Sequence, residues 1–373
     1  MDANRIVIVG AGIIGASIAY HLVKRGAKVV ILEAVRPGAG ATENSFGWIN
    51  ATFSKRPRAY FDLNQAGLAG WRRLEIELGG ELRVQWGGSV AWAGPDGAAE
   101  NLRANVQRHQ EWGYATHLID EDEFRRLLPN VAPGEFGAAC HCEFEGAVDP
   151  IDALKALLRQ VRELGGEVRS PFEADGMKLE GGRVTAIRAG ESSVDADVVV
   201  LASGVATQRL AEMAEVSIPL KESRGVLVHT RPQPKLIDRV VLAPGMHCKQ
   251  KLDGRVIVGG QIVAGVGTAD GEAPEHSTAG AGDNGQRILR EAARVLPGIR
   301  GVAVERVTVG HRVMPVDEYP VIGFSDRCPN LYVAAMHSGL TLAPLIGQLA
   351  ALEILDGARV SGLEPYRPSR FTD

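Results

Sequence analysis

Arg5-Ile-Val-Ile-Val-Gly-Ala-Gly-Ile-Ile-Gly15 opens the chain, and Val29-Val-Ile-Leu-Glu33 follows after an apolar segment. This order predicts a strand, a glycine turn, a helix and a second strand, which together form a βαβ unit that binds the diphosphate of a dinucleotide. Gly10 permits the sharp turn, Gly12 lets a phosphate approach the backbone, and Gly15 lets the helix pack closely on the strand. The helix N-terminus then presents unpaired N–H groups to that phosphate.

Glu33 narrows the choice of cofactor. It stands 18 residues after Gly15, at the end of the second predicted strand. A carboxylate there can accept hydrogen bonds from a ribose diol and would repel a 2′-phosphate. An adenosine cofactor without that phosphate is therefore favoured over NADP. A glycine turn without a ligand is the structural alternative, and the combination of strand, helix and acid disfavours it. The unit by itself does not distinguish FAD from NAD.

Composition limits the class of protein. The chain has 373 residues, enough for about two domains, with 45% apolar and 23% charged residues, as in ordinary globular proteins. A net charge of −4 gives no basic surface for nucleic acid. Serine, histidine, glycine and proline interrupt the apolar run over residues 331–352, which therefore predicts a strand, a turn and a helix and not a membrane span.

The N-terminus and the cysteines bear on the compartment and on metals. Because the dinucleotide unit begins at Arg5, with no charged and apolar leader before it, we expect a cytoplasmic protein. Four cysteines in a chain of this length do not make a disulfide framework. The three possible ligands in Cys140-His141-Cys142 are too close together and lack a second pair at zinc spacing, so no metal site is predicted.

The rest of the chain divides into two kinds of segment. Helices are expected over residues 58–78, 100–112, 121–128 and 150–164, the last one capped by Asp149-Pro150. Strands are expected near 82–86, 89–93, 167–178 and 183–188, and Ala196-Asp-Val-Val-Val-Leu-Ala-Ser-Gly204 is typical of a second buried parallel strand that ends near the cofactor. Alternating segments between residues 219 and 307, including 225–229, 239–242 and 255–259, predict a mainly antiparallel sheet that carries the substrate site.

A second helix N-terminus is expected near the C-terminal end. The segment from Asn330 to Pro344 predicts a strand, a glycine turn and a helix to about Leu355, with Pro344 in the first helical turn. A flavin would benefit most from this helix, because the reduced flavin carries negative charge around N1 and the C2 carbonyl and a helix dipole stabilises that charge.

In this order, the blocks resemble the D-amino-acid-oxidase-type family of FAD-dependent oxidoreductases, which includes glycine oxidase, sarcosine oxidase, D-amino acid dehydrogenase and opine or hydroxyproline dehydrogenase subunits. The resemblance spans nearly the whole chain. It rests on the N-terminal unit with Glu33, Gly38-Ala-Gly-Ala-Thr42 leading to Gly47, Gly146-Ala-Val-Asp-Pro150, the strand 196–204, Arg224-Gly225, Asp253-Gly254-Arg255 with Gly259-Gly260, and the C-terminal block from Val307.

The resemblance implies an α/β fold with two parts. A discontinuous Rossmann-like FAD-binding domain would cover residues 1–82, 144–212 and 309–373. A mainly antiparallel β-sheet substrate domain with flanking helices would cover residues 83–143 and 213–308. FAD is expected to be noncovalent, because no cysteine stands where sarcosine-oxidase-like members attach their flavin.

Carried over by position, the resemblance also implies the cofactor contacts. Residues near the pyrophosphate and the ribityl chain would be Gly10, Ala11, Gly12, Ile13, Ile14, Gly15, Ala41 and Thr42. The adenosine would meet Glu33, Ala34 and the backbone near Ala174, with Ala202, Ser203 and Gly204 lining the cofactor. The isoalloxazine would lie by Phe46, Gly47 and Trp48, and its N1 and O2 edge by Gly339, Leu340, Thr341 and Leu342. Trp48 could instead belong to the core, as tryptophans often do.

Two side chains are candidates for contact with substrate. Arg312 aligns with the arginine that holds the substrate carboxylate in glycine-oxidase-like members, and a guanidinium suits a carboxylate bidentately. A structural surface arginine is the alternative. His247 falls near a position that often supplies an active-site hydroxyl in relatives, although a single histidine on a strand is more often structural.

Two departures from the family pattern lie close to the expected flavin. The usual Arg-Pro before Pro-Asp-Gly is here Arg312-Val313 before Val316-Asp317-Glu318, and the usual Gly-His-Ser is Met336-His337-Ser338 in a loop about two residues shorter. Substrate and electron acceptor are therefore the features that the resemblance constrains least.

The resulting prediction is an FAD-dependent oxidase or dehydrogenase that removes hydride from a carboxylate-bearing amine: a D-amino acid, glycine, sarcosine, a proline-type imino acid or an opine. Oxygen, a quinone or a partner subunit would accept the electrons, and an oligomer is possible. One alternative keeps the fold and oxidises a 2-hydroxy acid, with His247 or His337 as base. Others are a flavin-binding subunit of a multi-subunit dehydrogenase and an NAD-only enzyme.

Overall fold

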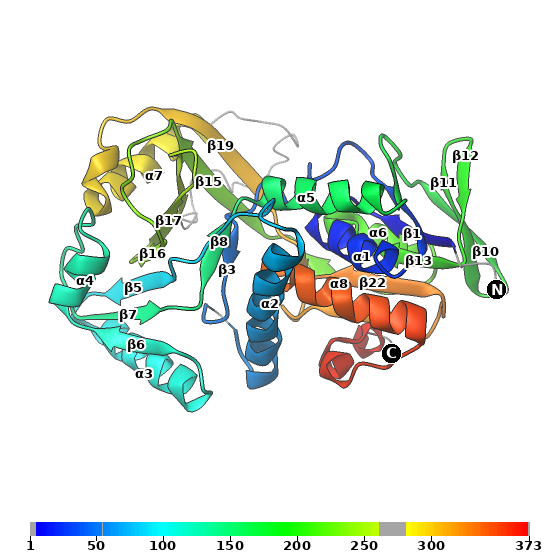
Figure 1. The fold of residues 1–373 in the computed structure, drawn as a ribbon, viewed down its shortest axis with the longest axis horizontal. Coiled ribbons are helices and arrows are strands. Elements are labelled where there is room, and N and C mark those ends of the chain that lie inside the picture. The colour runs from blue at the N-terminus through cyan, green and yellow to red at the C-terminus, as the bar shows by residue number, and fades with distance from the viewer. Residues whose placement is uncertain (1–4, 54, 261–280, 372–373) are drawn as a thin grey trace.

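The computed structural model describes residues 5–53, 55–260 and 281–371 and consists of two lobes that lie side by side (Figure 1). One lobe contains a sheet of mostly parallel strands covered by helices. The other contains a larger, mainly antiparallel sheet. The observed fold confirms the expected α/β class with a Rossmann-like part and an antiparallel part.

The first lobe is built on a six-stranded sheet in the order β21-β22-β13-β1-β2-β9. All neighbours pair in parallel except β21 and β22. The strands are β1 (Arg5–Val9), β2 (Lys28–Leu32), β9 (Glu167–Arg169), β13 (Val198–Leu201), β21 (Val321–Phe324) and β22 (Leu331–Ala335). Val and Ile fill most of β1 and β13, and both faces of these strands are buried, as expected for the centre of a parallel sheet.

Each face of this sheet has its own cover. Ile6 and Ile8 pack with the apolar residues of α1 (Ile13–Val23), α5 (Pro150–Glu163) and α8 (Gly339–Asp356). Val7 and Val9 face the other way, toward α6 (Thr207–Glu212) and a small sheet of β10 (Gly176–Glu180), β11 (Arg183–Ala189) and β12 (Ser192–Asp195). The alternation of side chains along a strand therefore divides the lobe into two cores.

Helix α8 packs against α1 and α2 (Arg58–Glu77) through small residues. A Cβ on Gly347 would lie 2.4 Å from Ser17 Oγ, and a Cβ on Gly67 would lie 2.6 Å from the carbonyl oxygen of Thr341. The hydroxyl of Ser17 also donates to the carbonyl oxygen of Ala343 at 2.7 Å. These contacts require glycine because the two backbones approach too closely for a side chain.

The expected place of Pro344 is wrong by one turn. Helix α8 begins at Gly339, so Pro344 lies inside the helix and not in its first turn. Proline lacks the N–H that would bond to the carbonyl of Leu340. The indole Nε1 of Trp71 donates to that carbonyl oxygen at 2.9 Å, so the group remains paired.

The second lobe is built on an eight-stranded sheet in the order β19-β15-β18-β17-β16-β5-β7-β6. Its pairs are antiparallel except for β16 with β5, which is parallel. The strands are β5 (Ser89–Ala93), β6 (Thr116–Ile119), β7 (Ala138–Cys142), β15 (Arg224–Thr230), β16 (Val240–Ala243), β17 (Met246–Gln250), β18 (Val256–Gly260) and β19 (Val304–His311). The flanking helices are α3 (Gly97–Glu111), α4 (Glu121–Leu127) and α7 (Ala281–Val295).

Short elements connect the two lobes. β3 (Trp48–Ile49) and β4 (Val84–Gln85) both pair with β8 (Gly146–Val148), and β14 (Leu220–Lys221) pairs with β20 (Met314–Pro315). Four short 3₁₀ turns complete the described elements: η1 (Gly204–Ala206), η2 (Pro297–Ile299), η3 (Ser361–Tyr366) and η4 (Pro368–Phe371).

Most predicted elements lie within a few residues of the observed ones, and three differ for physical reasons. The strand expected over 196–204 ends at Leu201, because the backbone turns at Ser203 and Gly204 has φ +63°. The strand expected over 167–178 is two strands, β9 and β10, in different sheets. Helix α7 was not predicted, because the alternating segments on either side of it dominate the pattern between residues 219 and 307.

Helix α8 is the one helix in the described ranges that is long and apolar enough to cross a membrane. Its apolar surface is used elsewhere, since 61% of the 18-residue window is buried inside the protein. The prediction of strand, turn and helix over residues 331–352 matches β22 and α8.

Replacing Gly347 with alanine should destabilise the first lobe. The added Cβ has Ser17 Oγ, His21 Cδ2 and the Ser17 carbonyl oxygen within 2.7 Å, and overpacking of this kind costs about 1–3 kcal/mol. Thermal and urea unfolding measure the loss. Gly97→Ala is the matched control, because its Cβ would meet nothing within 4 Å, and equal stability of both variants would contradict the close packing of α1 and α8.

Candidate functional site

A cavity of about 1640 Å³ runs between the two lobes. Pockets for one small molecule measure about 300–1,000 Å³, so this cavity has room for a dinucleotide beside a small substrate. Of the residues assigned from the sequence, those that line it are Gly10, Gly12, Ile13, Ile14, Glu33, Ala34, Ala41, Thr42, Phe46, Gly47, Trp48, Ala174, Ala202, Ser203, Gly204, His247, Arg312, Gly339, Leu340 and Thr341.

Three assigned residues lie behind the cavity wall. The N–H of Ala11 donates to Glu33 Oε2 at 2.9 Å. A Cβ on Gly15 would lie 2.0 Å from the carbonyl oxygen of Gly10, so Gly15 acts through packing. Leu342 is fully buried in the core and its N–H bonds to the carbonyl oxygen of Ser338 at 3.0 Å.

The turn after β1 is shaped for a close approach of backbone. Gly10 has φ +110°, and a Cβ there would lie 2.4 Å from the carbonyl oxygen of Ala202 at the end of β13. Gly12 precedes α1 and provides no side-chain cap, while Thr42 Oγ1 accepts from the N–H of Ile13 at 3.1 Å. The first turn of a helix leaves N–H groups without helical partners, and here it borders the cavity.

Glu33 is held by the backbone at both carboxylate oxygens. Oε2 accepts from Ala11 N–H, and Oε1 accepts from the N–H of Val35 at 3.1 Å. Each oxygen keeps a lone pair for a further donor. The carboxylate is therefore fixed at the cavity wall and can accept from a diol.

The segment Trp48–Asn50 is fastened to the start of α8. Thr341 Oγ1 accepts from the N–H of Asn50 and donates to the carbonyl oxygen of Trp48, both at 3.3 Å. Trp48 Nε1 donates to the fully buried carboxylate of Glu145 at 3.1 Å, and Ala51, Thr52 and Ser89 supply its other donors. Trp48 thus lines the cavity with its indole anchored at the far end.

Arg312 and His247 face the cavity from the sheet of the second lobe. Arg312 follows β19, and its guanidinium lies over Gly225, where a Cβ would be 2.9 Å from Nη2. No carboxylate of the described ranges forms an ion pair with it. His247 lies over Gly259 and meets the ring of Phe46 edge-on at 4.5 Å between centroids. Burial, and then the charge of Arg312, lower the pKa of His247 to about 4.

Two further residues line the cavity: His337, which the sequence suggested only as a base for a 2-hydroxy acid, and Lys55, which the sequence did not mark. His337 borders the cavity, and burial and the charges of Lys55 and Arg312 lower its pKa to about 4. Lys55 lies in the loop before α2, and its ammonium donates to Ser338 Oγ. Burial lowers the pKa of Lys55 to about 8. A lysine in a loop carries no sequence signal that would have marked it.

A departure from the family pattern has a visible consequence in the backbone. Glu318 has φ +70°, a conformation that glycine adopts without strain and other residues adopt rarely. It stands where the family pattern has glycine. Its carboxylate pairs with Lys221 at 2.6 Å, which ties the turn after β20 to β14.

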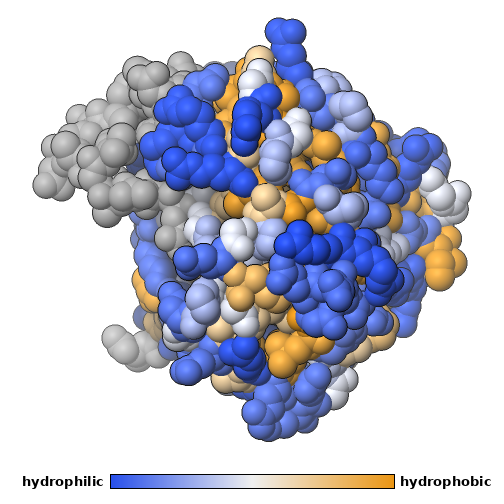
Figure 2. All heavy atoms as spheres, turned by 90° about the vertical axis from the view of Figure 1, so that its left-hand side faces the viewer, coloured by the Kyte–Doolittle hydropathy of each residue, from blue (hydrophilic) through white to orange (hydrophobic). Residues whose placement is uncertain are grey.

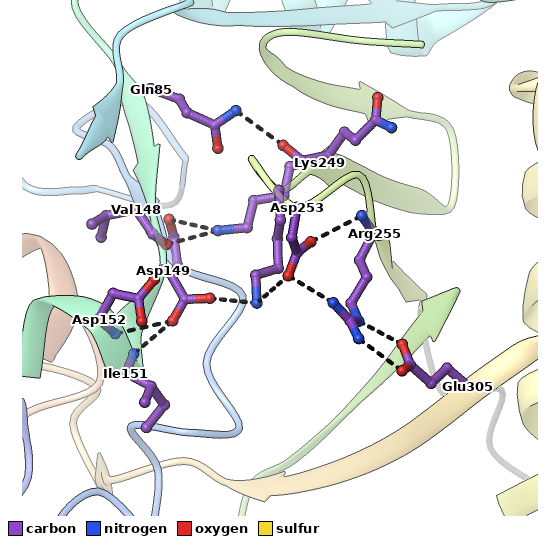
Figure 3. Close-up of polar contacts among 12 residues, drawn as sticks. Gln85, Val148, Asp149, Ile151, Asp152, Lys249, Asp253, Arg255 and Glu305 are labelled. Atoms are coloured by element: carbon purple, nitrogen blue, oxygen red, sulfur yellow. Dashed lines mark hydrogen bonds and ion pairs between the residues drawn. The ribbon is translucent and has the colours of Figure 1, made fainter. Parts of the chain in front are cut away.

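Lys249 joins the two lobes from a buried position (Figure 3). It is 2% exposed, and its ammonium donates to the carbonyl oxygens of Val148 at 2.8 Å and Gly47 at 3.3 Å. Gly47 has φ +78°, and a Cβ there would lie 2.5 Å from Lys249 Nζ. Strand β17 therefore places His247 on the cavity and Lys249 beneath the segment that borders it.

A chain of ion pairs continues this connection, as Figure 3 shows. Lys251 Nζ lies 2.5 Å from Asp149 Oδ2, and Asp149 also caps α5 by accepting from Ile151 N–H at 2.9 Å. Burial opposes the charge of Asp149, but the hydrogen bond and charge of Lys251 hold its pKa below the ordinary value. Asp253 and Arg255 extend the chain to Glu305 on β19.

A flavin dinucleotide fits what the cavity offers. Gly12 and Gly10 leave the backbone open for a pyrophosphate, and Glu33 is aligned for a ribose. The side-chain Oδ1 of Asn50 is buried beside the cavity and has no hydrogen-bond partner among the described residues. A buried acceptor without a donor costs free energy, and a bound cofactor can supply the donor.

A group of possible metal ligands lies outside this cavity. The donor atoms of His117, His141 and Glu143 lie within 4.8 Å of one another, because His117 and His141 face each other across β6 and β7. In the sequence, His141 stands beside two other possible ligands, Cys140 and Cys142. The cross-strand partner could be found only from the pairing of the strands.

Comparisons with known proteins show which family the chain matches. Residues 5–352 match the family model for FAD dependent oxidoreductases, DAO. The chain is 26% identical to a glycine oxidase of Bacillus licheniformis, over 98% of this chain and 96% of that protein. It is 26% identical to a subunit of an opine oxidase of Agrobacterium tumefaciens strain Ach5, over 98% of this chain and 97% of that protein. The crystal structure of glycine oxidase from Geobacillus kaustophilus superposes with a TM-score of 0.86 at 23% identity, and the match covers all of both chains.

Lys249→Met should change the pH dependence of stability. Burial lowers the pKa of Lys249 to about 7 in the folded protein, whereas a lysine in an unfolded chain titrates near about 10.4. Between these pH values the unfolded wild-type chain binds more protons than the folded one. The free energy of unfolding of the wild type therefore rises as pH increases from about 7 to about 10.5, and it decreases as pH falls through the same range.

The measurement is urea unfolding of wild type and Lys249→Met at several pH values from about 6 to about 10, a window that follows from the two pKa values above. The wild type should gain stability relative to the variant across that window. A difference that stays constant with pH would contradict the lowered pKa assigned to Lys249.

Proposed function

Because the chain belongs to the DAO family of FAD-dependent oxidoreductases, we propose that it dehydrogenates a small amine that carries a carboxylate, giving an imino acid. The observation that supports this most is Arg312, a guanidinium that faces the cavity without an acid partner in the described ranges. When bound, FAD would accept the hydride from the α-carbon of the substrate.

Arg312 would hold the carboxylate. A guanidinium forms two parallel hydrogen bonds with a carboxylate, which fixes the orientation of the α-carbon as well as its position. Its support by Gly225 limits the directions it can take, since the guanidinium lies on the backbone of β15. Orientation of this kind lowers the entropic part of the barrier.

The charges around the cavity favour a neutral amine. Arg312 and Lys55 are both cations, and His247 and His337 have pKa values of about 4, so they are uncharged near neutrality. A substrate ammonium would be repelled by the cations. The bound amine therefore loses its proton readily, and a neutral amine can release hydride without a protein base.

The same pKa values disfavour the oxidation of a 2-hydroxy acid. That reaction needs a base to take the hydroxyl proton, and an effective base has a pKa near the working pH. His247 and His337, each with a pKa of about 4, are weak bases at neutral pH. The hydroxy-acid alternative therefore lacks a suitable group among the histidines that were its candidate bases.

We propose that FAD is held without a covalent bond. Two of the four cysteines, Cys248 and Cys328, do not border the cavity. Cys142 borders it but is only 4% exposed. The remaining one, Cys140, is buried on β7. Release of the flavin by denaturation with acid, followed by separation from the protein, tests this directly.

A role as one subunit of a larger enzyme is the second candidate, because the similar opine oxidase protein is itself a subunit. Figure 2 shows mostly hydrophilic residues over one end of the molecule, with apolar residues in separate patches. A purified chain that binds FAD but is reduced by no amine would favour the subunit role.

The substrate class is tested by mixing the FAD-bound protein anaerobically with D-, L- and N-methyl amino acids, glycine, proline and opines. We expect at least one of these amines to bleach the visible absorption of the flavin. Bleaching by 2-hydroxy acids alone would overturn the proposal. Subsequent exposure to air or to a soluble quinone identifies the electron acceptor.

Arg312→Ala should weaken the binding of carboxylate substrates and of unreactive carboxylate inhibitors. We expect a loss of about 2 kcal/mol of binding free energy, or an increase of about 30-fold in Kd. This is at the lower end of the range for removing one partner of a charge pair, because the arginine is open to the cavity. Arg312→Lys should recover part of it. Arg224→Ala is the matched control, because Arg224 also lines the cavity but pairs with Glu222; an equal loss in both variants would contradict the assignment.

A further inference from the structure

Lys55 is a buried cation that forms no ion pair within the described ranges. It is 6% exposed and lines the cavity. Its ammonium donates to Ser338 Oγ and lies 5.1 Å from the centre of the Tyr60 ring. No carboxylate in the described ranges forms an ion pair with it, and Glu145, which acts on it at longer range, is already held by five hydrogen bonds. A buried charge in this state costs free energy unless an anion approaches it.

The position of Lys55 makes that cost larger. Ser338 is the N-cap of α8, an 18-residue helix whose N-terminus carries a positive partial charge. A cation at this end of a helix is repelled. The charge of Arg312 reaches the same region, since Lys55 and Arg312 both depress the pKa of His337. Three sources of positive potential therefore meet at one part of the cavity. The acids that act on this region at longer range are engaged elsewhere, Glu318 by Lys221 and Glu145 by its hydrogen-bond donors.

Asn50 provides an independent sign of a ligand at the same place. It is 9% exposed, and its N–H bonds to Thr341 Oγ1 in the first turn of α8. Its side-chain Oδ1 is buried and accepts no hydrogen bond from the part of the chain that the structure describes. The start of α8 thus combines two kinds of donor, the Lys55 ammonium and the N–H groups of the first helical turn, with one unpaired acceptor, Asn50 Oδ1.

This set complements one edge of a flavin. The pyrimidine part of the isoalloxazine presents acceptors at N1 and the C2 carbonyl, followed by one donor, the N3–H. On reduction, negative charge collects at N1 and the C2 carbonyl. A preorganised cation is worth most where charge develops in a site shielded from water.

We propose that Lys55 is a cofactor-binding residue whose ammonium, together with the N-terminus of α8, neutralises the negative charge of the reduced flavin at N1 and the C2 carbonyl, while Asn50 accepts from N3–H. The proposal rests on the proposed function, because it requires bound FAD. It assigns separate anions to Lys55 and Arg312: the flavin to Lys55 and the substrate carboxylate to Arg312.

The geometry separates these two roles. Lys55 is held at the N-cap of α8 through Ser338, in the lobe that carries the dinucleotide unit. Arg312 enters from β19 of the other lobe and rests on Gly225. A second carboxylate on the substrate is the competing partner for Lys55, and the experiment must distinguish it from the flavin.

Sulfite tests the charge at N1 without any substrate. Its sulfur lone pair forms a bond to N5 of the oxidised flavin, and an electron pair of the ring moves to N1 and the C2 carbonyl, so the adduct carries the negative charge in question and no other reactant is needed. The FAD-bound wild type is compared with Lys55→Gln, which retains a hydrogen-bonding group beside Ser338 without the charge, and with Lys55→Arg, which retains the charge.

We expect Lys55→Gln to weaken sulfite binding by at least about tenfold and to lower the two-electron midpoint potential by about 30 mV, the equivalent of tenfold. Lys55→Arg should stay within about threefold of wild type, on the order of half that free energy. The Kd of an unreactive monocarboxylate should be unchanged in both. If Lys55→Gln fails to retain FAD, the sulfite Kd and the midpoint potential are measured on Lys55→Met instead. A weakening of sulfite binding that Lys55→Arg does not restore counts against the proposal.

Two outcomes would overturn the inference. Unchanged sulfite affinity and potential in Lys55→Gln would show that the charge does not act on the flavin. Weaker binding of dicarboxylates, with unchanged flavin properties, would assign Lys55 to the substrate. Failure of the proposed function looks different, because the wild type would then purify without flavin or resist reduction by every amine.

Discussion

The contact between Gly10 and Ala202 is the constraint on which the rest of the site depends. There the end of β1 approaches the end of β13 so closely that a Cβ would lie 2.4 Å from a carbonyl oxygen, and Gly15 of α1 meets the Gly10 carbonyl in the same way. Two strands that are far apart in sequence therefore end at one point, beside the first turn of α1. The cavity begins there, with Gly10, Ala202 and the first turn of α1 in its wall.

The cavity ends at a segment that belongs to both lobes. Residues 46–50 are held by Thr341 of α8 on one side and by Lys249 of β17 on the other. Lys249 and His247 lie on the same face of their strand, as alternate residues do, and His247 contacts Phe46. The position of the second lobe relative to the dinucleotide unit is therefore fixed at the place where cofactor and substrate would meet. This role explains why the ammonium of Lys249 is retained although its burial costs free energy.

The sequence could predict features that depend on local pattern. The βαβ unit, the buried strand near 198–201, a helix N-terminus in the C-terminal block and the cavity position of Arg312 all follow from spacing or from the resemblance. The structure contains each, although α8 begins one turn earlier than expected. It could not predict Lys55, because a lysine in a loop has no periodicity, and its burial depends on Ser338, which lies 283 residues later. The same holds for the carbonyl of Leu340: the sequence places Pro344 in a first turn, where no helical hydrogen bond is lost. Only the structure shows that this bond is missing and that Trp71 replaces it. Domain boundaries and the individual cofactor contacts stay predictions.

The balance of charge connects these features to chemistry. Three acids near the cavity are used within the protein: Glu33 by two backbone N–H groups, Glu145 by five donors, and Glu318 by Lys221. The cations Arg312 and Lys55 are not compensated in this way within the described ranges. An uncompensated cation raises the affinity for anions and lowers the pKa of any amine bound beside it. A carboxylate on the substrate would thus pair with Arg312, and the loss of a proton would make the amine a hydride donor. The negative charge that the hydride brings to the flavin would then be neutralised by Lys55.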